Sequence, residues 1–393
     1  MSEPLPLPDP ALGEPFLLTP GPLTTSATVK QAMLRDWGSW DADFRAVTAE
    51  IRQRLLAMLD APEGYDCVPM QGSGTFSVEA MLGSFVPPAG KVLVLSNGAY
   101  GKRIAETLRY LGRAYTEIDT GDYLPARGPE VGAALRADPA IGHVVIVHCE
   151  TSSGILNPVK EIADVVAAEG RKLLIDAMSA FGAIGLEGVS YEALVSSANK
   201  CIEGVPGFGY VIARLSALEA ARGHSHSLSL DVHAQWAHMN KTGQWRFTPP
   251  THGVVAFLEA LKAHKAEGGV QGRGARYANN RDVVVSGMRA LGFETLLLDD
   301  WMSPIIVTFF CPASPAFEFA RFYELMKARG FIIYPGKLTV ADSFRIGCIG
   351  QMDAAIMRRV VAAAAEALAE MGVNSAAPPE NALKERAKLA AKP

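Results

Sequence analysis

The positions of apolar residues divide most of the chain into short buried segments and longer segments with a helical repeat. Val, Ile and Leu dominate the centres of five short runs, with little alternation of polar side chains. The runs span residues 91–96, 143–150, 172–179, 193–199 and 209–214. Such runs are typical of strands that are buried on both faces of a mainly parallel sheet. Helical patterns lie between them, at 76–82, 101–111 and 159–169. We therefore predict an α/β fold in three layers.

The pattern changes after about residue 255, where long helical segments precede a few short apolar runs. This order predicts a smaller α+β domain that follows the sheet domain. The tail begins with a Pro/Ala/Asn break and ends in charged residues, so we expect it to be loosely attached. The predicted divisions are an N-terminal arm (1–20), a large domain (21–265), a small C-terminal domain (266–375) and a tail (376–393).

The composition and charge of the chain allow an enzyme that acts on small molecules. The chain has 393 residues, of which 49% are hydrophobic, and a formal net charge of -4. Because it has no basic block, we expect no nucleic-acid partner. We expect no membrane span, because no run of about 18 uncharged apolar residues is present. The proline-rich N-terminus also lacks the pattern of a secretory signal.

Cysteines and histidines give no sign of disulfides or a metal site. The five cysteines are scattered, odd in number and without a CxxC pair, which favours a reducing, cytoplasmic location. His224, His226 and His233 lie close together but lack supporting Cys or carboxylate residues at metal spacing. We therefore expect no bound metal.

Lys200 and Asp176 are the strongest candidates for a functional site. Lys200 ends an apolar run and precedes a glycine- and proline-rich loop, where partial desolvation would make its amine nucleophilic. Asp176 lies in an apolar run and requires a cationic partner, such as the pyridinium nitrogen of pyridoxal 5'-phosphate. A solvated surface lysine and a helix-capping aspartate are the alternatives. Ligands of open α/β sheets bind beyond the carboxyl ends of the strands, so both residues indicate one site.

Further polar residues follow other predicted strands. The segment Gly72, Ser73, Gly74 and Thr75 runs into a helical pattern, which suits a phosphate. It lacks the GK[ST] ending of a Walker A motif and does not match GxGxxG. Tyr100 is either a ring that stacks on a cofactor or a partly buried loop residue. The hydroxyls of 151–153 either bind the cofactor's phenolic oxygen or form a turn. Arg345, between Phe344 and Ile346, indicates a carboxylate or phosphonate ligand or a structural salt bridge.

The order of these residues resembles the class V aminotransferases of the type I pyridoxal-phosphate fold. The resemblance runs from residue 16 to the last helix of the small domain and rests on several specific segments. These are LLTPGPLTTS, DWGSWD, HCETSSGILNP, DAMSAFG, SSANKCIEGVPGFG, HSLSLD, RFTPPTH, YPGKLT and FRIGCIG. Together they are most similar to family members that transfer the amino group of 2-aminoethylphosphonate to pyruvate. Alanine–glyoxylate and serine–pyruvate aminotransferases are the nearest alternatives, followed by a pyridoxal-phosphate lyase.

The resemblance implies a role for each candidate residue. Lys200 would bind pyridoxal 5'-phosphate covalently, and Asp176 would bind its ring nitrogen. Arg345 would bind the substrate's anion. The resemblance also implies a homodimer, in which Thr248 reaches the cofactor phosphate of the partner subunit. The other implied cofactor contacts are Ser73, Gly74 and Thr75 at the phosphate, Tyr100 on the ring and Ser153 near the ring oxygen.

Overall fold

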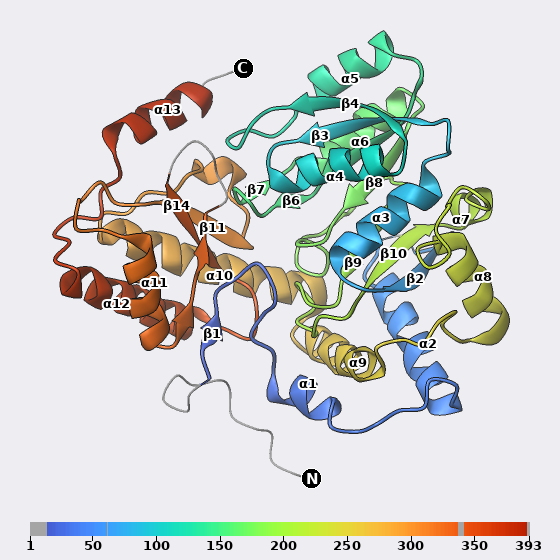
Figure 1. Ribbon diagram of the computed structural model, residues 1–393, viewed down its shortest axis with the longest axis horizontal. Helices are drawn as coiled ribbons and strands as arrows, with labels where there is room; N and C mark the ends of the chain where they lie inside the picture. Colours follow the sequence, from blue (N-terminus) through green and yellow to red (C-terminus); the bar gives the residue numbers. More distant parts are fainter. Residues whose placement is uncertain (1–13, 61, 337–341, 391–393) are drawn as a thin grey trace.

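A seven-stranded sheet forms the centre of the larger part of the molecule (Figure 1). The computed structural model describes residues 14–60, 62–336 and 342–390. Most of the predicted N-terminal arm, the last three residues of the tail and part of the YPGKLT segment lie outside these ranges. The strand order is β2-β10-β9-β8-β5-β3-β4, and β10 runs antiparallel to the other strands of this sheet. The strands are β2 (Tyr65–Gln71), β3 (Lys91–Ser96), β4 (Ala114–Asp119), β5 (Ile141–Val147), β8 (Lys172–Asp176), β9 (Ala193–Ser197) and β10 (Phe208–Arg214).

Helices cover both faces of this sheet and produce two separate apolar cores. Leu93 and Leu95 of β3 face the core shared with α2, α5, α6 and α9, whereas Val92 and Val94 face the core shared with α3, α4, α7 and α8. This arrangement confirms the predicted three-layer α/β fold. The helices of this part are α1 (Ala27–Ala32), α2 (Ala42–Leu56), α3 (Gly74–Phe85), α4 (Ala99–Tyr110), α5 (Gly128–Ala137), α6 (Val159–Ala168), α7 (Leu215–Ala220), α8 (Val232–Thr242) and α9 (Thr251–Ala266).

The five predicted strands are all present, but two others were not predicted. The edge strand β4 is largely exposed and has the sequence AYTEID, so it contains no apolar run. β2 carries polar residues at both ends of its buried centre. The hydrophobic pattern of a sequence reveals a strand only where the strand is buried. These two strands therefore give a weaker pattern than the other five.

The smaller part contains the three-stranded sheet β11-β14-β13 and its own apolar core. The long helix α10 extends beside both parts of the molecule (Figure 1). The N-terminal segment joins the smaller part, because β1 pairs in parallel with β12. The elements are β1 (Phe16–Leu17), α10 (Gly269–Ala290), β11 (Ile306–Phe310), α11 (Phe319–Ala328), β12 (Phe331–Ile332), β13 (Tyr334–Pro335), β14 (Ser343–Gly347) and α12 (Ala354–Glu370).

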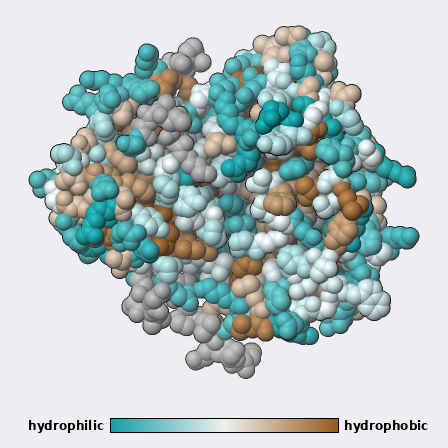
Figure 2. Space-filling view, viewed as in Figure 1, coloured by the Kyte–Doolittle hydropathy of each residue, from teal (hydrophilic) through white to brown (hydrophobic). Residues whose placement is uncertain are grey.

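The tail differs from the loosely attached segment that we expected, because it forms the helix α13 (Glu380–Ala390). Arg386 donates a hydrogen bond of 2.6 Å to the Thr295 carbonyl, and Ala382 is buried against a small apolar cluster. Most of the surface in Figure 2 is hydrophilic, with smaller hydrophobic patches. Within the described ranges, no helix is both long and apolar enough to cross a membrane.

Candidate active site

The carboxyl ends of β8 and β9 bring Asp176 and Lys200 to one cavity. These strands are parallel neighbours; Asp176 is the last residue of β8, and Lys200 lies three residues beyond the end of β9. Both residues line a cavity of about 490 Å³. The other predicted residues that line it are Ser73, Gly74, Thr75 and Tyr100. The structure therefore brings six of the nine predicted residues together; Ser153, Thr248 and Arg345 do not line this cavity.

The amine of Lys200 is buried and held by a backbone carbonyl. Its Nζ donates a hydrogen bond of 2.5 Å to the Pro20 carbonyl oxygen. Gly21 packs against it so closely that a Cβ at this position would lie 2.6 Å from Nζ. Burial lowers the pKa of Lys200 to about 8, although nearby charges that include Asp176 partly oppose the shift. The neutral, nucleophilic amine is therefore populated close to neutral pH.

Asp176 is a buried carboxylate that forms no ion pair with a described residue. Its side chain accepts a hydrogen bond of 3.0 Å from the Met178 backbone N–H. Burial raises the pKa of Asp176 to about 6, the Met178 hydrogen bond opposes the shift, and Glu150 adds to it. A cationic ligand group in the cavity would stabilise the ionised form.

The N-terminus of α3 offers an anion site at the same cavity. Ser73 is its N-cap, in an extended conformation, and its side chain makes no capping hydrogen bond. The first backbone N–H groups of a helix have no partner within the helix, so they are available to an anion. A Cβ at Gly74 would lie 2.5 Å from the Met178 sulfur, so a larger residue there would require the Met178 side chain to move.

Glu150, which we did not predict, anchors the start of α4 and therefore Tyr100. It is fully buried and accepts hydrogen bonds from the backbone N–H groups of Tyr100 (3.0 Å) and Gly101 (3.2 Å). It also accepts from the N–H and hydroxyl of Ser152, at 3.1 and 2.5 Å. Burial raises the pKa of Glu150, and these four donors oppose that shift. The sequence signal was a carboxylate at the end of an apolar run, the same signal that identified Asp176.

Arg103 is a second residue that we did not predict. It lines the cavity, and its guanidinium carbon lies 5.1 Å from the centroid of the Tyr100 ring. Its charge also lowers the pKa of Asp176, as a smaller contribution than burial. The helical repeat of α4 places it one turn after Tyr100, and that spacing could have indicated it.

Ser153, Thr248 and Arg345 lie outside the cavity. The hydroxyl of Ser153 is buried 3.5 Å from the Glu150 carbonyl. Thr248 is exposed, and its carbonyl accepts a hydrogen bond of 2.5 Å from the Gln71 side chain, next to the predicted phosphate site.

Arg345 is fully buried on β14, and its guanidinium contacts backbone carbonyls. It donates to the Pro335 carbonyl at 3.0 and 2.9 Å and to the Thr151 carbonyl at 2.8 Å. No carboxylate of the described residues lies within ion-pairing distance of it. The structural salt bridge that was one interpretation of Arg345 is therefore not formed with any described residue.

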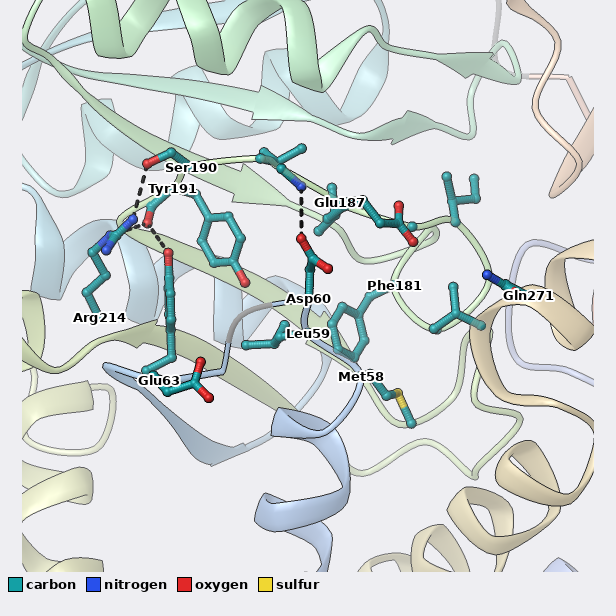
Figure 3. Close-up of a pocket in the computed structure, with 18 of the residues that line it drawn as sticks. Met58, Leu59, Asp60, Glu63, Phe181, Glu187, Ser190, Tyr191, Arg214 and Gln271 are labelled. Atoms are coloured by element: carbon teal, nitrogen blue, oxygen red, sulfur yellow. Dashed lines mark hydrogen bonds between the residues drawn. The ribbon is translucent and has the colours of Figure 1, made fainter.

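A second cavity, of about 410 Å³, lies beside the amino-terminal end of β9 (Figure 3). Arg214 and Tyr65 there donate hydrogen bonds of 2.9 Å to the Tyr191 carbonyl. None of the predicted site residues lines it. Because ligands of open α/β sheets bind beyond the carboxyl ends of the strands, the cavity that contains Lys200 is the stronger candidate.

Comparisons with known proteins agree with the geometry of the first cavity. The family profile "Aminotransferase class-V" matches residues 27–319. The chain belongs to the class-V aminotransferase family. A 2-aminoethylphosphonate–pyruvate transaminase of Rhizobium meliloti (strain 1021) is 75% identical over 97% of this chain and 100% of that protein. A Paraburkholderia xenovorans (strain LB400) protein with the name 2-aminoethylphosphonate–pyruvate transaminase 1 is 67% identical over 97% of this chain and 99% of its own.

Solved structures support the same fold. A pyridoxamine-pyruvate aminotransferase from Mesorhizobium loti has a TM-score of 0.83 at 22% identity, and the match covers 98% of each chain. An aspartate aminotransferase from Thermus thermophilus has a TM-score of 0.80 at 23% identity and covers 91% of this chain and 99% of its own. The predicted aminotransferase fold is thus confirmed.

As a family member, the chain is an aminotransferase that depends on pyridoxal 5'-phosphate. The cavity fits this cofactor at three points. It offers the amine of Lys200 to an aldehyde, the Asp176 carboxylate to a ring nitrogen, and a helix N-terminus to a phosphate. Within the described ranges, no cluster of His, Cys, Asp and Glu residues could hold a metal ion.

The lowered pKa of Lys200 predicts how cofactor uptake depends on pH. Only the neutral amine attacks the aldehyde, so the rate of covalent uptake by the cofactor-free protein should rise about tenfold per pH unit below about 8 and level off above it. Stopped-flow absorbance between pH 6 and 10 measures this rate, and Lys200→Ala should abolish the covalent phase. A rate that still rises tenfold between pH 9 and 10 would show that the amine has an ordinary pKa.

Proposed function

We propose that this enzyme transfers the amino group of 2-aminoethylphosphonate to pyruvate, releasing phosphonoacetaldehyde and L-alanine. The observation that carries this proposal is the 75% identity, over almost the whole chain, to a protein with that name. The site is compatible with it, because both substrates carry an anion and Arg345 is a buried cation without a carboxylate partner among the described residues. Its planar fork suits phosphonate and carboxylate alike.

In the proposed mechanism, Lys200 would hold the cofactor until the substrate's amine displaces it. The freed neutral amine of Lys200 would then take a proton from the amine-bearing carbon of the substrate and deliver it to the C4′ atom of the cofactor. Bound pyridoxal 5'-phosphate supplies an electron sink for the negative charge that develops on this carbon. Asp176 would keep the ring nitrogen protonated. The positive charge of that nitrogen would in turn favour the ionised form of Asp176 in spite of its burial. The N-terminus of α3, with Ser73, Gly74 and Thr75, binds the phosphate.

Other residues orient the reactants in this proposal. Tyr100 would stack on the cofactor ring. Glu150 holds Tyr100 in place, because it accepts hydrogen bonds from backbone N–H groups at the start of α4. Ser153 lies next to Glu150 in the turn that carries the Thr151 carbonyl, and we assign its hydroxyl to the ring oxygen. Arg345 binds the phosphonate in one half-reaction and the carboxylate in the other.

The proposal also includes a homodimer in which Thr248 completes the partner subunit's site. Thr248 is exposed and lies in the proline-rich segment just before α9, which limits its flexibility. Its contact with Gln71 keeps it beside the start of α3 in its own subunit. A cytoplasmic location and a division into domains 21–265 and 266–375 belong to the same proposal.

A donor screen tests the proposed substrates. With pyruvate as acceptor, the enzyme should form alanine faster from 2-aminoethylphosphonate than from serine or other amines. Arg345→Lys keeps the charge but loses the fork, so it should weaken both the phosphonate donor and pyruvate by roughly 2–4 kcal/mol.

Arg321→Lys is the matched control for this screen, because Arg321 is an exposed residue of α11 that pairs with Glu370. It should leave both KM values unchanged. Preference for serine over the phosphonate donor would contradict the proposed function, and unchanged KM values in Arg345→Lys would remove Arg345 from the site.

Complementation between subunits tests the role of Thr248. If Thr248 serves the partner subunit, a mixed dimer of Lys200→Ala and Thr248→Ala chains has one site with both defects and one site with neither. Activity should then return in part, whereas each variant alone stays impaired. Verified mixed dimers that show no recovery would place Thr248 in the site of its own subunit.

A further inference from the structure

One face of α10 carries four polar side chains that contact two functional loops. Arg273, Arg276, Tyr277 and Asn280 occupy positions i, i+3, i+4 and i+7 of the helix, so they lie on the same side of it. One of the loops directly follows Lys200, and the other directly follows the strand that carries Arg345. α10 therefore connects the two ends of the proposed substrate site.

The loop after Lys200 is fixed through Cys201 and Glu203. Arg273 donates a hydrogen bond of 2.5 Å to the Cys201 carbonyl. The carboxylate of Glu203 accepts from Arg276 at 2.7 Å and from the Tyr277 hydroxyl at 2.6 Å. Glu203 has a φ of 63°, which is unusual for a residue other than glycine, so these contacts hold a strained backbone.

The loop after Arg345 is fixed through its backbone carbonyls. Arg276 donates to the carbonyls of Gly350 at 2.5 Å and Met352 at 2.8 Å. Asn280 donates to the carbonyls of Cys348 and Met352, both at 3.0 Å. Arg276 therefore forms charge-assisted hydrogen bonds with both loops at once.

The position of the Arg276 guanidinium is itself tightly determined. Glu267 accepts from its Nε at 2.6 Å and from Arg273 Nε at 2.7 Å. Two arginines thus face the carboxylates of Glu203 and Glu267, which balances the charge. A lysine has no planar fork and cannot reproduce this set of contacts.

We propose that Arg276 is a positioning residue for substrate recognition and sets the location of Arg345 relative to Lys200. This inference rests on the proposed function. Only two carbon atoms separate the amine from the phosphonate in 2-aminoethylphosphonate, so Lys200 and Arg345 must be held at a fixed separation. A displacement of the loop after Arg345 would move its guanidinium away from the position of the anion. It would therefore weaken any anion bound there and misalign a substrate that is bound at both ends. Cofactor binding would not depend on this separation.

The test compares Arg276→Lys with Arg289→Lys, a control on the same helix whose partner is Asp299. The probe is ethylphosphonate, which keeps the anion but lacks the reactive amine, and calorimetry with the holoenzyme gives its Kd. Arg276→Lys should weaken ethylphosphonate at least tenfold and lower kcat/KM for 2-aminoethylphosphonate. The slow half-reaction with propylamine, which has no anion, should stay within twofold of wild type, as should cofactor content. Arg289→Lys should match wild type throughout.

Equal losses with propylamine and with the phosphonate donor would overturn the inference, as would wild-type affinity for ethylphosphonate. If Arg276→Lys does not fold, Asn280→Ser removes two contacts to the same loop and should shift these measurements in the same direction. If wild type itself does not bind ethylphosphonate, the proposed function is wrong. The same comparison with propionate, an unreactive analogue of pyruvate, then decides whether Arg276 positions Arg345.

Discussion

The burial of two ionisable groups at the ends of β8 and β9 is the constraint on which the site depends. Parallel pairing of these strands places Asp176 and Lys200 at the same edge of the sheet. Burial raises the pKa of Asp176 to about 6 and lowers the pKa of Lys200 to about 8, so it favours the neutral form of each group. Each side chain has one backbone hydrogen bond among the described residues. A cofactor with a cationic ring nitrogen and an electrophilic carbon would give Asp176 a charged partner and Lys200 an atom to attack.

The N-terminal segment and α10 connect this edge to the smaller sheet. The Pro20 carbonyl accepts from Lys200, and two residues earlier the Leu18 carbonyl accepts from the Gly347 N–H at the end of β14. Gly347 allows this approach, because a Cβ there would lie 2.6 Å from the Thr19 carbonyl oxygen. Arg276 makes a second connection, because it bonds both to Glu203 after Lys200 and to the Gly350 carbonyl after β14. The amine and the buried arginine are thus linked through two separate segments of the chain.

The parts of the structure that could be predicted from the sequence are those whose burial produces a clear apolar run. The strands β3, β5, β8, β9 and β10 are continuous apolar runs, and Asp176 and Lys200 stand out because they interrupt or end such runs. The exposed strand β4 has no such mark. Glu150 was overlooked because its donors on α4 lie about 50 residues away in the sequence. The carbonyls of Pro335 and Thr151 that accept from Arg345 could not be predicted, because the sequence does not specify which distant backbone groups approach a side chain.

The account depends most directly on the identity of the lysine that binds the cofactor. Borohydride reduction of the holoenzyme, followed by proteolysis and mass spectrometry, locates the covalently trapped cofactor on a single peptide. The predicted result is a pyridoxyl-phosphate adduct on Lys200. An adduct on a different lysine, with Lys200 unmodified, would contradict the assignment of this cavity as the active site.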